Sequence, residues 1–362
     1  MKKIDSLEYG TFIWFIIRSC FVVTTSGILL LNCQEDAWIC IILGIILGLF
    51  PSFIYNKIKK KFPDDNIFQI NENVFKSFGK LINLIISLSV LLLGILIFWI
   101  LITFITTQFL YTTPPFIVGI FLITPIIYIN TKNLKTIGRV SIFCFYITVT
   151  FAIIIIAGLF KEINIDNLKP FLYHTPGNII YSTLIFICYS ILPLFLLTVI
   201  PKNKIKNYKT KTNFLFYLLG TLSLLNLMFF NITIFGINLA TLYEYSSFHL
   251  LKRVDIFEII DRIETILTIE WILGLIIILS LIVYFLKKYY TQISKKENKK
   301  KENIFIILSS LIILIISSFI FKTHGSSTIF FKGPSLIIYF ITFLIIPFIT
   351  LIKSFHIQNN PC

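Results

Sequence analysis

Four residues with small or hydroxyl-bearing side chains interrupt the first long apolar run of this chain: Thr24, Thr25, Ser26 and Gly27. An unbroken membrane-spanning helix has no evident use for this stretch, so we predict that the helix unwinds here. The amides of Gly27, Ile28 and Leu29 then begin a second half-helix, whose first turn has unpaired N–H donors and about half a positive charge. Such a helix start suits an anion such as the carboxylate of an amino acid. Close helix packing through small residues is the alternative interpretation.

A proline interrupts a later apolar run, "ICYSILPLFLL" at residues 187–197. Because Pro193 lacks a backbone N–H and its ring clashes with the carbonyl four residues earlier, we expect this helix to break too. Tyr189 and Ser190 stand just before the break. With two aromatic residues of another run as walls, the predicted ligand-binding residues are Thr24, Thr25, Ser26, Gly27, Phe98, Trp99, Tyr189, Ser190 and Pro193.

Two charged residues inside apolar runs are candidate gating residues. Arg18 lies nine residues after Tyr9, about 13 Å along a helix and therefore near the middle of a bilayer. A charge there costs at least about 2.5–3.5 kcal/mol, so Arg18 must face the bundle interior or water. It is either a gate that pairs with a carboxylate or a structural tie to backbone carbonyls, and the sequence assigns it no partner. Glu270, next to Trp271, either lines a water-filled vestibule or reaches the headgroups.

The composition places these residues in a membrane. The chain is 57% hydrophobic and only 14% charged, whereas soluble domains carry about 25% charged residues. Long apolar runs recur over the whole length, which predicts an all-α polytopic membrane protein. We expect ten transmembrane helices, near residues 9–31, 37–56, 81–110, 116–130, 140–160, 179–200, 213–236, 265–286, 303–321 and 335–352.

The positions of the basic residues explain the net charge of +15 and predict the orientation. Of the 32 Lys and Arg residues, 24 fall in one set of alternate segments, including Lys59, and 7 fall in the other set. Basic residues are enriched on the cytoplasmic side, so both termini are predicted to be cytoplasmic. The charge is therefore a signature of membrane topology, and no nucleic-acid partner is expected.

Ten spans divide into two halves of five, within one membrane domain that covers 1–362. Because five is odd, the second half (179–352) enters the membrane from the side opposite to the first half (9–160). This is the pattern of an inverted repeat, in which transporters place their site at midplane on broken helices of corresponding position. The first and sixth spans are such a pair, and they contain the two predicted breaks.

Motifs of enzyme chemistry are not found. The chain has no Walker A, HExxH or GxSxG motif, and its His and Cys residues show no metal-ligand spacing. We therefore predict a protein that is not an enzyme and that has no cofactor and no metal.

Several segments resemble the B-subunit family of spore-germination nutrient receptors. "FGINLATLYEYSSFHLLKRVDIFEIIDRIETILTIEWI" at 235–272 is similar to that family's outer loop and eighth span, with Arg262, Glu264 and Trp271 at its Arg, Glu and Trp. "SGILLL" in the first span, "NIDNLKP" at 164–170 and "PKNKIKN" at 201–207 agree with it. The resemblance covers the whole chain.

The resemblance implies a fold like that of amino acid–polyamine–organocation transporters, with an inverted repeat of five plus five spans and broken first and sixth helices. It also implies a location in the inner membrane of bacterial spores, partners in the form of A and C receptor subunits, and a small nutrient ligand that triggers germination. The sequence departs from the family at Pro193 and Phe195, where members often have Gly and Glu, so the ligand chemistry stays open.

Two rival functions stay open as well. One is a cation-coupled amino-acid permease, and the other is a scaffold that has lost its ligand. The fold cannot choose among them, but a permease accumulates substrate against a gradient, whereas a receptor subunit copurifies with its partners.

Overall fold

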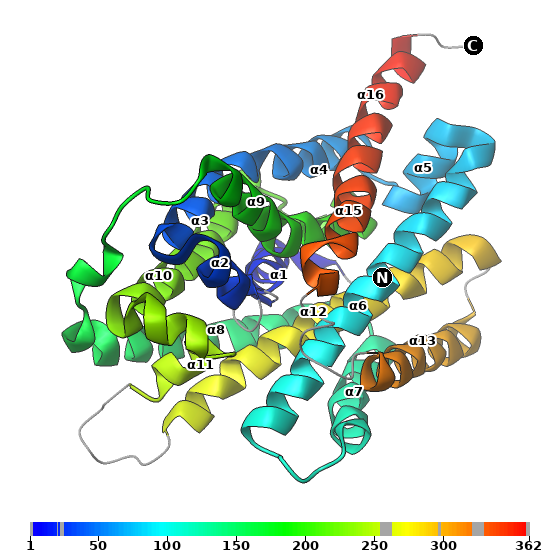
Figure 1. Ribbon diagram of the computed structural model, residues 1–362. Helices are drawn as coiled ribbons and strands as arrows, with labels where there is room; N and C mark the ends of the chain where they lie inside the picture. Colours follow the sequence, from blue (N-terminus) through cyan, green and yellow to red (C-terminus); the bar gives the residue numbers. More distant parts are fainter. Residues whose placement is uncertain are drawn as a thin grey trace.

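The computed structural model describes residues 3–19, 21, 25–253, 263–295, 298–320 and 329–359 of the chain. Within them, strand structure is confined to β1 (Ile4–Asp5) and β2 (Ile205–Lys206), and helices make up most of the rest (Figure 1). Eight helical stretches are long and apolar enough to cross a membrane: Ser26–Lys61, Ile67–Gln108, Leu134–Glu162, Pro176–Val199, Thr210–Leu242, Thr268–Ser294, Lys299–Phe319 and Pro334–Phe355. The chain is an all-α polytopic membrane protein.

The described helices differ widely in length, from 6 residues in α11 to 33 in α10. In chain order they are α1 (Ser6–Ser19), α2 (Ser26–Cys33), α3 (Ala37–Leu47), α4 (Leu49–Lys61), α5 (Ile67–Phe75), α6 (Gly79–Gln108), α7 (Pro115–Thr131), α8 (Leu134–Leu159), α9 (Pro176–Phe186), α10 (Thr210–Leu242), α11 (Ser246–Leu251), α12 (Ile263–Ser294), α13 (Lys299–Phe319), α15 (Pro334–Tyr339) and α16 (Ile346–Asn359). Three further segments are η6, a π-helix (Ile187–Ile191), η7, a 3-10 helix (Leu192–Val199), and η9, a π-helix (Phe340–Ile345).

Every predicted span overlaps described helices. The predicted first span corresponds to α1 and α2, and the predicted fourth span to α7, whose 17 residues include Pro125. The third span is the 30-residue helix α6, as the long apolar run indicates. The crossing of all ten segments, and the inverted repeat, stay predictions.

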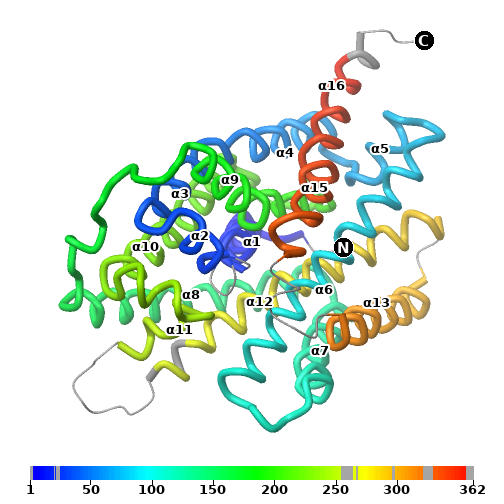
Figure 2. Tube along the Cα trace, in the orientation of Figure 1, coloured from blue at the N-terminus to red at the C-terminus, as the bar shows by residue number. Residues whose placement is uncertain are grey.

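Helix α1 lies in the middle of the bundle. It contacts α8, α10, α12, η6 and η7, and Figure 2 shows it near the centre of the view. Nearly all its residues are buried, from Glu8 to Ser19. The helices around it expose apolar side chains instead, such as Phe143 and Ile153 on α8, which suits contact with lipid.

The basic end of the bundle is closed by backbone pairing. Strands β1 and β2 run parallel, with Ile4 opposite Ile205, so the segment before the first span pairs with the segment after the sixth. The amide of Asn203 donates to the carbonyl of Pro63 at 3.0 Å, which ties in the end of α4.

Several residues of the basic-residue count lie at helix ends. Lys59 belongs to the last turn of α4 and is 5% exposed. Counting charges along a sequence does not distinguish the last turn of a helix from the loop that follows it, because both carry lysines here.

Candidate functional site

The first-span break lies between two separate helices. Helix α1 ends at Ser19 and α2 begins at Ser26, and Thr24 lies outside the described residues. Thr25 is the N-cap residue of α2 with a right-handed helical backbone and no side-chain capping bond. Ser26 and Gly27 therefore form the first turn of α2, which is where the predicted anion site needs them. Unwinding of the backbone before Thr25 stays a prediction.

Gly27 faces the connection between α10 and α11. A Cβ atom on Gly27 would lie 3.8 Å from the carbonyl oxygen of Glu244, an ordinary van der Waals distance. A methyl group therefore fits at this position, and a larger side chain would extend beside this carbonyl.

The sixth span departs from α-helical geometry where the proline predicts it. Helix α9 ends at Phe186, and the chain continues as the π-helix η6 and then as the 3-10 helix η7. Pro193 is the second residue of η7, where its missing N–H and its ring prevent the regular hydrogen bond to residue 189. π-helical turns are rare and occur frequently at functional sites.

The ends of the two interrupted spans meet. Helix α1 contacts η6 and η7, and α2 contacts α9. The rings of Phe21 and Phe186 pack edge to face, with centroids 5.6 Å apart. The Cys33 thiol, at the end of α2, lies 3.1 Å from the Ser182 hydroxyl on α9. These contacts place the first span against the sixth span close to the two predicted breaks.

A third segment, just before and at the start of α15, borders this region. The Tyr189 hydroxyl contacts the Phe331 carbonyl at 2.7 Å and the Ser335 hydroxyl at 2.5 Å. The ammonium of Lys332 donates to the Asn32 side chain at 3.1 Å, which ties the same segment to the end of α2. No sequence pattern singled out this segment, because its contacts join positions more than 140 residues apart.

The two predicted aromatic walls face different elements. The Trp99 ring lies 6.2 Å from the Phe331 ring, which in turn lies 5.3 Å from the Tyr189 ring. The Phe98 ring faces α7, where its Cε1 atom lies 3.7 Å from the place of a Cβ on Gly119. Trp99 thus borders the region of the breaks, whereas Phe98 belongs to the packing between α6 and α7.

Ser190 is a buried polar group inside this region. Its side chain has no exposed surface, and its hydroxyl has no hydrogen-bond partner among the described residues. Buried polar groups are nearly always hydrogen-bonded, so this hydroxyl is available to a ligand or a water molecule.

The partner of Arg18 is the other candidate gating residue. The guanidinium Nη2 of Arg18 lies 2.7 Å from Oε1 of Glu270 on α12, and the side chains are 14% and 2% exposed. Nη1 donates to the Ser223 hydroxyl at 3.0 Å, and the guanidinium lies 4.9 Å from the centre of the Trp14 ring. The Arg18 guanidinium, predicted to lie near the middle of the bilayer, thus has a counter-ion and a hydrogen-bond acceptor.

The ion pair borders a small cavity beneath α11. The cavity has a volume of about 90 Å³ and is lined by Arg18, Glu270, Trp271, Leu250 and residues of α8 and α10. Movement of α11 would therefore change the surroundings of the pair, which is what a gating role requires.

These observations define a helical membrane protein in which α1 and α2 of the first span pack against η6, η7 and α9 of the sixth span. The chain belongs to the spore germination protein family, whose sequence profile matches residues 10–326.

Two relatives come from Bacillus subtilis (strain 168). The chain is 25% identical over 245 residues to putative spore germination protein YfkT, and the matched region covers 67% of this chain and 66% of the relative. It is 22% identical over 259 residues to spore germination protein KB, and that matched region covers 69% of this chain and 68% of the relative. The chain thus spans about two thirds of each relative's own length.

Proposed function

We propose that this protein is the membrane subunit of a spore nutrient-germinant receptor and that it binds a small nutrient, in particular an amino acid. The observation that supports this function is the packing of the first span against the sixth, in which α2, which begins at Ser26, contacts α9 and α1 contacts η6. Family membership supports the role in germination. The A and C subunits of the receptor, and the spore inner membrane with both termini in the cytoplasm, are part of the proposal.

The ligand's two charged groups have separate partners in this proposal. The carboxylate lies at the N-terminal turn of α2, where amides of Gly27 and its neighbours point and the helix dipole favours negative charge. The hydroxyl of Ser190 accepts a hydrogen bond from the ammonium group, and Trp99 and Tyr189 form an aromatic wall. Ligand binding then shifts a two-state equilibrium of the bundle, which the partner subunits sense. The ion pair of Arg18 and Glu270 acts as the gate.

The first test is a substitution that fills the start of α2. Gly27→Trp places an indole against the Glu244 carbonyl and in the path of the ligand. We expect it to raise the nutrient concentration for half-maximal germination at least about tenfold, which corresponds to about 1.4 kcal/mol. Gly177→Trp is the matched control, because nothing lies within 4 Å of a Cβ there. A wild-type dose response of Gly27→Trp spores would place the site elsewhere.

The second test is ligand-induced thermal stabilisation of the purified protein, screened over amino acids, sugars and nucleosides. A ligand at 100 times its Kd stabilises the folded state by about 2.7 kcal/mol. Stabilisation that is lost in Gly27→Trp and kept in Gly177→Trp identifies the nutrient class. Uptake of the same ligand against a gradient in vesicles would favour a permease instead.

A further inference from the structure

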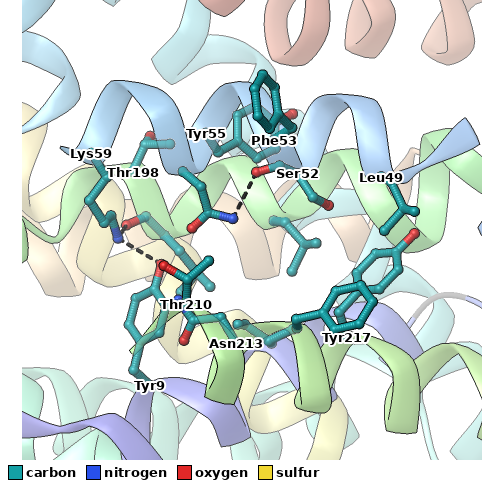
Figure 3. A pocket seen from close by; sticks show the side chains of 15 residues that line it. Tyr9, Leu49, Ser52, Phe53, Tyr55, Lys59, Thr198, Thr210, Asn213 and Tyr217 are labelled. Atoms are coloured by element: carbon teal, nitrogen blue, oxygen red, sulfur yellow. Dashed lines mark hydrogen bonds between the residues drawn. The ribbon is translucent and has the colours of Figure 1, made fainter. Parts of the chain in front are cut away.

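A second cavity lies at the basic end of the bundle, among α1, α4, η7 and α10 (Figure 3). Its volume is about 260 Å³. None of the residues assigned to the nutrient site lines this cavity. The kind of ligand it binds is therefore inferred from the residues that do line it.

A buried lysine stands at one end of this cavity. The Lys59 ammonium donates to the Tyr9 hydroxyl at 2.6 Å and to the Leu197 carbonyl at 2.8 Å, and it lies 4.3 Å from the centre of the Tyr9 ring. An ammonium has three donors, so one is left over. Lys59 is in none of the ion pairs found in the described part of the chain. A buried charge without a counter-ion is costly, so the site favours an anion.

A buried amide lines the same cavity. The side chain of Asn213 is 5% exposed, and neither its oxygen nor its nitrogen has a hydrogen-bond partner in normal geometry among the described residues. Neighbouring Asn56 is satisfied, because its amide donates to the Ser52 carbonyl and its oxygen accepts from Tyr208. The Asn213 amide lies close enough to the Tyr208 hydroxyl to interact with it, and that hydroxyl donates its hydrogen to Asn56. Because a side-chain amide has two N–H donors, at least one N–H of Asn213 is left to pair with a ligand.

The other end of the cavity is apolar and opens outward. Leu49, Phe53 and Phe214 line it and are 39%, 56% and 50% exposed, so the cavity reaches the surface between α4 and α10. Exposed apolar side chains on membrane-spanning helices face lipid. The Lys57 ammonium lies 5.2 Å from the centre of the Phe53 ring, and Lys209 and Lys211 flank Thr210, which lines the cavity. Basic residues near a membrane surface attract anionic lipids.

We propose that this cavity binds an anionic amphiphile from the bilayer. The acid group pairs with the free donor of Lys59 and with the Asn213 amide, and the hydrocarbon chain leaves between Phe53 and Phe214. The volume is just below the range of about 300–1,000 Å³ for drug-sized ligands, so it accommodates the acid group and the first part of one chain. The bound molecule bridges α1, α4 and α10, and its binding stabilises the closed basic end of the bundle.

The test uses a fatty acid that carries a photoreactive diazirine, with the corresponding alcohol as the uncharged probe. Full-length protein in phosphatidylcholine nanodiscs is labelled over a range of probe concentrations, and the labelled peptides are mapped by mass spectrometry. We expect labels within α4 and the first two turns of α10. Lys59→Met should raise the half-saturating concentration at least about tenfold, and Asn213→Leu severalfold. The control Lys300→Met, which removes an exposed ammonium at the start of α13, away from the cavity, should change it less than twofold.

A second measurement identifies the source of the acid group. Native mass spectrometry of protein from phosphatidylglycerol nanodiscs shows whether the wild type retains this phospholipid and Lys59→Met does not. Retention identifies a phospholipid headgroup as the occupant, and labelling by the free acid alone identifies a free carboxylate.

Three results would overturn the proposal: labels outside this cavity, equal labelling by the alcohol and the acid, or binding that is unchanged in both Lys59→Met and Asn213→Leu. If Lys59→Met does not fold, the result for Asn213→Leu decides, since this substitution removes an uncharged amide and leaves the Lys59 ammonium in place. The readout is occupancy of the cavity, so neither result depends on whether the protein senses nutrients.

Discussion

Arg18 and Glu270 are 252 positions apart in the chain, and their side chains form an ion pair at 2.7 Å. Glu270 is nearly fully buried in it. Removal of one partner leaves the other charge buried without compensation, which typically costs about 3–5 kcal/mol, whereas replacement of both by apolar groups is often close to neutral. At the scale of the residue, the pair is therefore expected to behave as a unit.

A double-mutant cycle tests this expectation. We predict that Arg18→Met and Glu270→Met each lower the thermal stability of the purified protein strongly, and that the double variant loses much less than the sum of the two. Lys169→Met is the control, because it breaks an exposed ion pair with Asp166, and such pairs contribute little. Additive losses from Arg18→Met and Glu270→Met would mean that the two charges are not coupled.

Sequence reasoning identified both members of this pair but not the pair itself. The cost of a charge at mid-depth shows that Arg18 needs a partner, but periodicity holds no information on which distant helix supplies it. The same limit applies to Phe331 and Ser335, which contact Tyr189 from a segment that carries no motif. Polar contacts between distant spans depend on the packing of the whole bundle.

At the scale of the element, the sequence predicts more of the structure than it does for contacts between distant residues. Apolar run lengths located the spans, and Pro193 correctly predicted the end of α-helical geometry in the sixth span. The predicted end of the seventh span, residue 236, is a glycine with φ 63° and ψ 168° inside α10. This backbone conformation is accessible essentially to glycine alone, so Gly236 bends the helix where the apolar run ends.

Substitution of this glycine is predicted to strain α10. Gly236→Ala should destabilise the protein by about 1–3 kcal/mol, because a Cβ atom disfavours this backbone conformation. The Asn167 side chain is 3.6 Å from the added atom, so a clash adds little. Thermal unfolding of Gly236→Ala measures the loss, and Gly177→Ala, at an open position of α9, should be neutral or slightly stabilising. Equal midpoints for the two variants would show that α10 tolerates a regular backbone at 236.

At the scale of the whole molecule, the outward apolar surface predicts where charges are tolerated. Ile153 is 64% exposed in the middle of α8, and Tyr111 is 76% exposed in the connection between α6 and α7. If lipid covers α8, Ile153→Lys costs about 2.5–3.5 kcal/mol on insertion and Tyr111→Lys costs little. The yield of folded protein in the membrane fraction measures both. Equal yields would indicate that Ile153 faces water.

The pairing of β1 with β2 has a practical consequence for reporter fusions. A protein domain attached immediately before Ile4 would lie against the backbone contacts that hold the sixth-span end in place, and its bulk would compete with them. The far end of α16 projects beyond the other helices (Figure 1), so a fusion after it leaves the β1–β2 contacts alone. A fluorescent fusion that follows α16 is therefore the better way to locate the protein in spores without disturbing it.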